Sequence, residues 1–194
     1  MEELLSKVKA VLKDDYNNWY SITKNIIIDS EYQKRKYFKH HEKESVFEHS
    51  ILVSACSYKL AKKHHTNIYN STIAGLLHDF YTYPWQYSIE LEKLDSKYKE
   101  HFKENTKHKK FLELHGFTHA IDAANNASIY YEKYINEKIV SAIRTHMFPL
   151  SLLTKYKIPN CKEGYIITLA DKIITLKDFP TPNEIPKYLG IRKK

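Results

Sequence analysis

The sequence predicts an all-α protein that folds as a single-domain helical bundle over residues 1–194. Apolar residues recur at the three- and four-residue spacing of amphipathic helices along most of the chain. Only 4 Gly and 6 Pro are present, fewer than the tight turns of a β-sandwich or barrel require. With 194 residues, of which 42% are hydrophobic, the chain is long enough to bury one core and short for two domains.

The first 38 residues are expected to be helical. The predicted segments are residues 2–13, residues 16–28, and a basic, aromatic segment from Asp29 to about Phe38, followed by a polar loop over residues 39–44. Two isoleucine runs, 26–28 and 166–167, are the only stretches whose pattern also fits a strand.

The middle of the chain carries the clearest helix signals. Ser45 and Glu48 have the spacing of a capping box, which predicts a helix from there to about His64. Asn67 or Asn70 can cap the next helix, expected from Ser71 to about His78. Residues 81–114 are rich in charge and are interpreted as an excursion over the surface, with one or two helices, that shapes a pocket.

Three further helices are predicted in the C-terminal half. They run from His119 to about Ile135 with Thr118 as cap, from Glu137 to Met147 with Asn136 as cap, and from Glu163 to Asp178. Pro149 should end the second of them, residues 151–161 should form a loop, and the prolines at 180, 182 and 186 should interrupt the tail.

Charge and cysteine content limit the class of protein. The net charge is +8 and the pI about 9.2, but the lysines are dispersed, which favours a solvated basic surface over a nucleic-acid groove. No apolar run approaches the length of a membrane span, and the N-terminal segment lacks the pattern of a signal peptide. The two cysteines make no disulfide framework. We therefore expect a cytoplasmic protein.

Several ionisable residues fall on apolar helix faces. Asp171 lies between Ile167 and Ile174 at helical spacing, and an uncompensated buried carboxylate costs several kcal/mol. Similar positions are held by His49, the adjacent pair His78-Asp79, His119 and His146. One alternative is that each His is a satisfied core residue. The other is a shared cation, because metal sites in helical bundles are built from side chains on facing helices.

The remaining histidines are interpreted differently. A surface position is expected for His40, His41, His64, His65, His101 and His108. His115 lies four residues before His119, across Gly116, which we expect to break the helix. His115 can be a ligand, a residue that orients a ligand, or a substrate contact.

This ordered set resembles the HD-domain superfamily of metal-dependent phosphohydrolases. That family is marked by a His on one helix, a His-Asp pair about one helix later, a distant Asp and, in two-metal members, two further His. The matching residues here are His49, His78-Asp79, His119, His146 and Asp171, so the resemblance covers about residues 45–178, on which helices within 2–38 would pack. The segment Phe80–Trp85 replaces the Ile-Gly-Lys common after the pair, so no substrate is carried over.

The resemblance implies a divalent-metal enzyme. One ion would be held by His49, His78, Asp79 and Asp171, and a second by His119 and His146 with Asp79 as the bridge. Nitrogen and carboxylate ligands suit Fe, Mn or Zn, with Mg or Ni also compatible. Metal-activated water would hydrolyse a small phosphorylated molecule or nucleotide, as a phosphomonoester or a phosphodiester.

Further roles are hypotheses on the same resemblance. His115 would give a proton to the leaving oxygen, and Arg144 and Lys172 would contact phosphate. Two other functions stay open. One is a di-iron oxygenase, because relatives such as myo-inositol oxygenase use the same ligands. The other is a non-catalytic module that binds a nucleotide or nucleic acid.

Overall fold

The computed structural model describes residues 1–40, 44–84, 89–104, 115–153 and 158–177, and it confirms the all-α prediction. Within these ranges the helices are α1 (Glu2–Leu12), α2 (Tyr16–Ile27), α3 (Ser30–Gln33), α4 (Val46–Lys63), α5 (Ile68–Leu77), α6 (Ile89–Leu94), α7 (Lys97–Glu104), α8 (His115–Tyr130), α9 (Glu137–Thr145) and α10 (Lys162–Lys177). Short 3-10 helices cover Lys13–Asp15, Lys34–Tyr37, Glu132–Tyr134 and Leu150–Leu153.

Neither isoleucine run that also fitted a strand forms one: Ile26 and Ile27 end α2 with Ile28 as its C-cap, and residues 166–167 lie in α10. The described residues contain one isolated β-bridge, between Lys39 and Ser45. No helix in the described ranges combines the length and the apolar character that crossing a bilayer requires.

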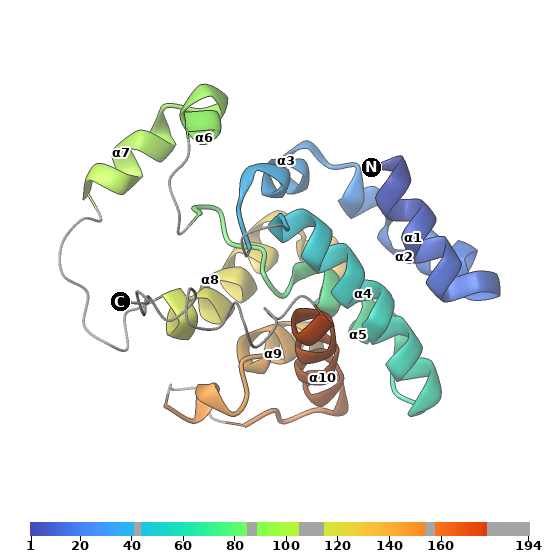
Figure 1. Cartoon of the computed structure of the whole chain (residues 1–194). Coiled ribbons are helices and arrows are strands. Elements are labelled where there is room, and N and C mark those ends of the chain that lie inside the picture. Colours follow the sequence, from blue (N-terminus) through green and yellow to red (C-terminus); the bar gives the residue numbers. More distant parts are fainter. Residues whose placement is uncertain (41–43, 85–88, 105–114, 154–157, 178–194) are drawn as a thin grey trace, which may run out of the picture.

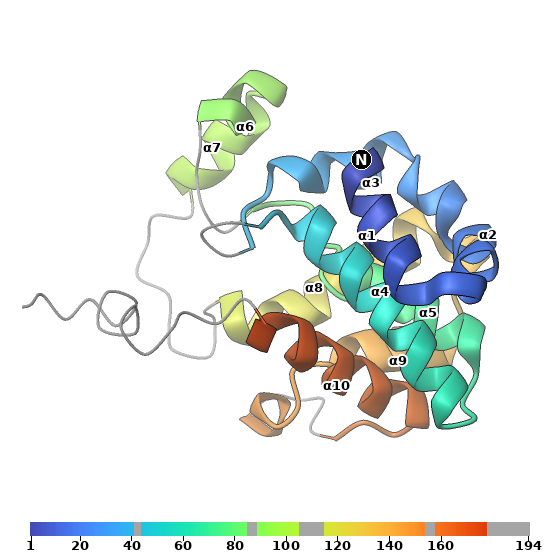
Figure 2. The same ribbon diagram turned by 45° about the vertical axis from the view of Figure 1, so that its right-hand side comes forward.

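Helices α4 and α5 form the centre of the bundle, with α9 and α10 packed against them (Figures 1 and 2). The capping box predicted at the start of α4 is confirmed, because Ser45 Oγ accepts from the Glu48 amide and the Glu48 carboxylate accepts from the Ser45 amide. Asn67 caps α5, which therefore begins three residues earlier than predicted.

Gly75 allows the close approach of α5 to α4. A Cβ at this position would lie 2.7 Å from Ser57 Oγ and 3.1 Å from Ser54 Cα, both on α4. A contact of 2.7 Å is too short for a Cβ, so any larger residue here would force Ser57 to shift. The glycine thus sets how deeply the end of α5, with the His-Asp pair just beyond it, enters the bundle.

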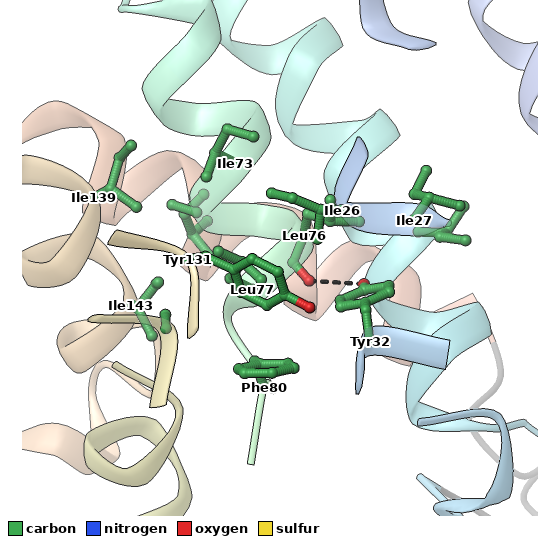
Figure 3. Packing of buried hydrophobic residues seen from close by; sticks show 14 of the residues in the cluster. Ile26, Ile27, Tyr32, Ile73, Leu76, Leu77, Phe80, Tyr131, Ile139 and Ile143 are labelled. Carbon is green, nitrogen blue, oxygen red and sulfur yellow. Dashed lines mark hydrogen bonds between the residues drawn. The ribbon is translucent and has the colours of Figure 1, made fainter. Parts of the chain in front are cut away.

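The N-terminal helices share one hydrophobic core with α4, α5, α8, α9 and α10. Hydrogen bonds reinforce this packing. Trp19 Nε1 donates to Ser54 Oγ at 3.1 Å, and that hydroxyl donates to the Thr72 carbonyl at 2.9 Å. The Tyr32 hydroxyl donates to the Leu76 carbonyl at 2.9 Å, as the dashed line in Figure 3 marks. The α2–α3 segment therefore holds the end of α5 that leads to the His-Asp pair.

Helices α6 and α7 lie to one side of the bundle (Figures 1 and 2). Leu91 and Tyr98 of these helices form a small core with Phe38, Val46 and Tyr81. The prediction of helices within residues 81–114 is confirmed for residues 89–104. Residues 85–88 and 105–114, including Trp85, lie outside the described ranges.

The predicted start of α8 was wrong. The helix begins at His115 and runs through Gly116, so Thr118 is not its cap, and it ends at Tyr130 rather than Ile135. A Cβ on Gly116 would have nothing within 4 Å, so the helix passes this residue without steric conflict. The low helix propensity of a single glycine near a helix start is outweighed by the packing of the helix as a whole.

Two other boundaries differ from the predictions. The segment after Asp29 forms only the four-residue α3 and a 3-10 turn, with the Asp29 side chain as N-cap. α9 ends at Thr145, two residues early, so that His146 stands at its C-cap. The chain turns here because Pro149 cannot continue a helix.

Candidate metal centre

Six side chains predicted from separate segments lie together in the folded protein. His49 comes from α4, His78 and Asp79 from the end of α5, His119 from α8, His146 from the end of α9, and Asp171 from α10. All but Asp171 are buried. The two oxygens of Asp79 face different neighbours, so this carboxylate divides the cluster into two sides.

The first side lies at Asp79 Oδ2. His78 Nε2 is 3.4 Å from this oxygen and 3.7 Å from Asp171 Oδ1. His49 Nε2 is 3.0 Å from the same Asp171 oxygen. Two imidazoles and two carboxylates therefore converge, and atoms of His49, His78 and Asp171 are close enough together to hold one ion.

The second side lies at Asp79 Oδ1. His119 Nε2 is 3.5 Å and His146 Nε2 is 3.8 Å from this oxygen. The two Nε2 atoms are 3.1 Å from each other. Two ligands held at about 2.1 Å from one ion are separated by about 3.0 to 3.4 Å, so the 3.1 Å spacing of the two Nε2 atoms fits coordination, and the two distances to Asp79 Oδ1 are slightly longer.

Backbone carbonyls orient three of the imidazoles. His78 Nδ1 lies 2.9 Å from the Gly75 carbonyl, His119 Nδ1 lies 2.8 Å from that of His115, and His146 Nδ1 lies 2.8 Å from that of Ile143. A carbonyl can only accept, so each Nδ1 donates its N–H to that carbonyl and each ring directs Nε2 to the centre. This arrangement is the usual one for histidines that bind metal.

The crowding of ionisable groups shifts the pKa values of two members of the cluster. Burial favours the protonated form of Asp79, but the neighbouring His78, His119 and His146 outweigh it and hold the carboxyl pKa well below its usual range. Burial, together with His78 and His119, lowers the pKa of His146 to about 3. Asp79 is therefore ionised and His146 neutral near pH 7, as metal ligation requires.

His49 has the opposite balance. Burial lowers its pKa, but hydrogen bonds to Asp171 and Glu44 prevail and raise it to about 9. For Asp171, burial raises the carboxyl pKa, but the hydrogen bond to His49 prevails and holds this pKa below its usual range. The two shifts have one cause, because the 3.0 Å hydrogen bond between His49 Nε2 and Asp171 Oδ1 favours the protonated imidazole and the ionised carboxyl.

The donor set fits a divalent ion. Asp79 Oδ1 and His78 Nε2 are buried and make no hydrogen bond in the described part of the chain. Unpaired buried polar atoms are costly, and both point into the cluster. Nitrogen and carboxylate donors without thiolate suit Fe, Mn or Zn, and also Mg or Ni. The identity and number of ions remain predictions.

The residues predicted for other roles lie at the edge of this cluster. The His115 ring is 4.9 Å from the His119 ring and 4.8 Å from the Tyr81 ring, centroid to centroid. Its backbone carbonyl, which any residue at position 115 would supply, lies 2.8 Å from His119 Nδ1, so the three roles considered for the His115 side chain stay predictions. Its role as a proton donor stays a prediction.

The two predicted phosphate contacts have other partners. Lys172 Nζ donates to the Phe148 carbonyl at 2.7 Å, and burial lowers the pKa of its amine. Arg144 Nη2 donates to Asn125 Oδ1 at 3.2 Å. Arg144 lines two surface hollows, one of about 790 Å³, and none of the described residues lining them belongs to the six. Their contact with substrate therefore stays a prediction.

One prediction about the cluster was wrong. His40 was assigned to the surface, yet its ring stacks on His49 at 3.6 Å and its Nε2 is 3.5 Å from Asp79 Oδ2. Glu44 Oε2 also reaches the site, 3.5 Å from His49 Nδ1. His40 and Glu44 precede α4 and belong to no helix, so no helical periodicity indicates which way their side chains face. The capping box was the one available signal, because it fixes how the chain enters α4.

These features define a class: a helical protein with a buried His/Asp centre suited to divalent metal. The protein-family model of the HD domain matches residues 46–176. The chain belongs to this family, a superfamily of metal-dependent phosphohydrolases, as the resemblance predicted. No curated protein and no solved structure matches the chain.

Proposed function

We propose that the protein is a phosphoric ester hydrolase that uses metal-activated water on a small phosphorylated molecule or nucleotide. The single observation that carries the proposal is the position of Asp79, whose two oxygens face two sets of histidine nitrogens. A carboxylate in that position can bridge two cations and fix their separation.

Each residue of the cluster then has a defined task. His49, His78, Asp79 and Asp171 would hold one ion, and His119 and His146, with Asp79 again, the other. Bound divalent ions supply a hydroxide near neutral pH and neutralise the charge of a phosphate. The carbonyls of Gly75, His115 and Ile143 keep three rings in the tautomer that binds metal.

The surroundings of the cluster support such chemistry. Phe80 and Tyr81 directly follow the His-Asp pair and are buried, which limits the access of bulk water from this side. A low local dielectric strengthens the attraction between a cation and its carboxylates. Substrate contacts by His115, Arg144 and Lys172 complete the proposal.

The test combines elemental analysis with a substrate screen. The purified protein should contain divalent metal and hydrolyse a phosphomonoester or phosphodiester in a panel supplied with Mn, Fe, Co, Ni or Mg. Asp79→Asn should lose both bound metal and hydrolysis, because the amide cannot supply the bridging charge. Asp14→Asn is the matched control, since Asp14 is exposed.

The outcomes separate the alternatives. Hydrolysis that survives in Asp79→Asn would contradict the mechanism. Two iron atoms per chain, with oxygen uptake and no hydrolysis, would favour the di-iron oxygenase. Strongly salt-dependent binding of nucleic acid by a protein without hydrolytic activity would favour the non-catalytic module.

A further inference from the structure

The backbone before α4 holds His40 in a fixed place. The amide of Val46 donates to the Phe38 carbonyl at 2.8 Å, and the amide of His40 donates to the Glu44 carbonyl at 2.9 Å. Lys39 and Ser45 form the isolated bridge between them. Phe38 is fully buried in the small core that Leu91 and Tyr98 complete, so the chain is anchored two residues before His40.

The His40 side chain points into the cluster. Its ring lies 3.6 Å from that of His49 with an interplanar angle of 18°, and its side chain is only 14% exposed. His40 Nε2 is 3.5 Å from Asp79 Oδ2, the oxygen that His78 Nε2 approaches to 3.4 Å. Ring nitrogens of His40 and His49 and an oxygen of Asp79 are mutually close enough to hold one ion.

Stacking alone does not account for this position. An imidazole that only stacked on His49 could keep its nitrogens in solvent, whereas here Nε2 is directed to a buried carboxylate. That direction removes the nitrogen from bulk water and places it among the other donors. A ring nitrogen gains from such a site when it binds the cation that the carboxylates hold.

We propose that His40 is an additional ligand of the ion on the Oδ2 side of Asp79, an inference that rests on the proposed metal centre. This ion then has three imidazoles and two carboxylates, from His40, His49, His78, Asp79 and Asp171. His40 precedes the segment matched by the HD-domain family model, residues 46–176, so the ligand comes from this chain's own N-terminal extension.

Five protein ligands have a consequence for the choice of metal. Zinc is usually held by four ligands in a tetrahedron, whereas Mn, Fe, Co and Ni accept five or six. The Oδ2 side would therefore favour one of these ions with a single position left for water or substrate. The side with only His119, His146 and the shared Asp79 would bind its ion less tightly.

The test uses metal binding rather than activity. Chelator-stripped full-length protein is titrated with Mn²⁺ and with Co²⁺, and the visible absorption of bound Co²⁺ is recorded because its intensity reports coordination number. His40→Phe keeps an aromatic ring to stack on His49 but has no nitrogen. His40→Gln is a second variant with a smaller, polar side chain, and His64→Phe is the matched control at an exposed histidine.

We expect His40→Phe and His40→Gln to weaken the tighter Mn²⁺ site at least about tenfold. They should also change the Co²⁺ spectrum towards lower coordination number, while His64→Phe leaves both unchanged. Thermal unfolding of the stripped variants shows whether they are folded. If one of the two His40 variants is unfolded, the metal affinity of the folded one tests the inference.

Wild-type affinity and an unchanged Co²⁺ spectrum in a folded His40 variant would overturn the inference. Asp79→Asn, titrated in parallel, separates this result from failure of the whole centre. If Asp79→Asn loses metal and His40→Phe does not, the centre stands and only the ligand role of His40 falls. If wild-type protein and Asp79→Asn bind alike, the proposed centre itself fails.

Discussion

Tyr32→Phe tests whether the N-terminal helices stabilise the part of α5 that carries the His-Asp pair. Tyr32 is 1% exposed, and its hydroxyl donates to the Leu76 carbonyl at 2.9 Å (Figure 3). The amide of Phe80, which would bond the Leu76 carbonyl if the helix continued, donates to the Leu77 carbonyl instead. Removal of the hydroxyl therefore leaves a buried carbonyl without this donor.

The expected cost follows from these contacts. A net hydrogen bond contributes about 0.5 to 1.5 kcal/mol, and an unsatisfied buried carbonyl raises the loss to about 1 to 2 kcal/mol. For a chain of this length each kcal/mol lowers the Tm by about 2 to 4 °C, so we expect a fall of about 2 to 8 °C.

The assay is thermal unfolding followed by circular dichroism in the presence of a chelator, so that metal binding does not contribute. Tyr37→Phe is the matched control, because Tyr37 is 47% exposed and should change the Tm by less than about 1 °C. A Tyr32→Phe protein with the wild-type Tm would refute the reasoning.

Three further outcomes are expected. Gly75→Val should destabilise the protein by about 1 to 3 kcal/mol in denaturant unfolding, because its Cβ meets Ser57 and Ser54, whereas Gly116→Ala should be neutral or stabilising by up to about 1 kcal/mol. Saturation with Mn²⁺ at 100 times its Kd should add about 2.7 kcal/mol, and an unchanged Tm would contradict a metal centre. Without metal, stability should fall as the pH drops below 6.5, because burial, together with His78 and His119, keeps the folded-state pKa of His146 near 3 while the unfolded chain takes up the proton. His49, whose folded-state pKa is about 9, changes the stability mainly above pH 6.5 and in the opposite direction, so thermal unfolding is compared at pH 6.5 and 5, where His146→Gln should reduce the dependence.

Much of the fold was predictable because local signals and the final packing agree. The capping box at Ser45 and the side-chain cap at Asn67 act within a few residues, so their effect is visible in the sequence. The start of α8 was not predictable from the sequence. The free-energy cost of one glycine near a helix start is smaller than the stabilisation from burying Ala120, Ala123 and Ala124. A helix boundary depends on the sum of local propensity and tertiary burial, and the sequence does not show the burial.

The sequence by itself determined the helical class and the six side chains of the cluster, Asp79 among them. A helical period of 3.6 residues shows which face of a segment is buried, and a carboxylate on that face needs a partner. Only the tertiary structure decided the rest: the division of the cluster between the two oxygens of Asp79, the carbonyls that orient the rings, and the place of His40. These features depend on the distances between segments far apart in the chain, and for an irregular loop no periodicity indicates where a side chain will point.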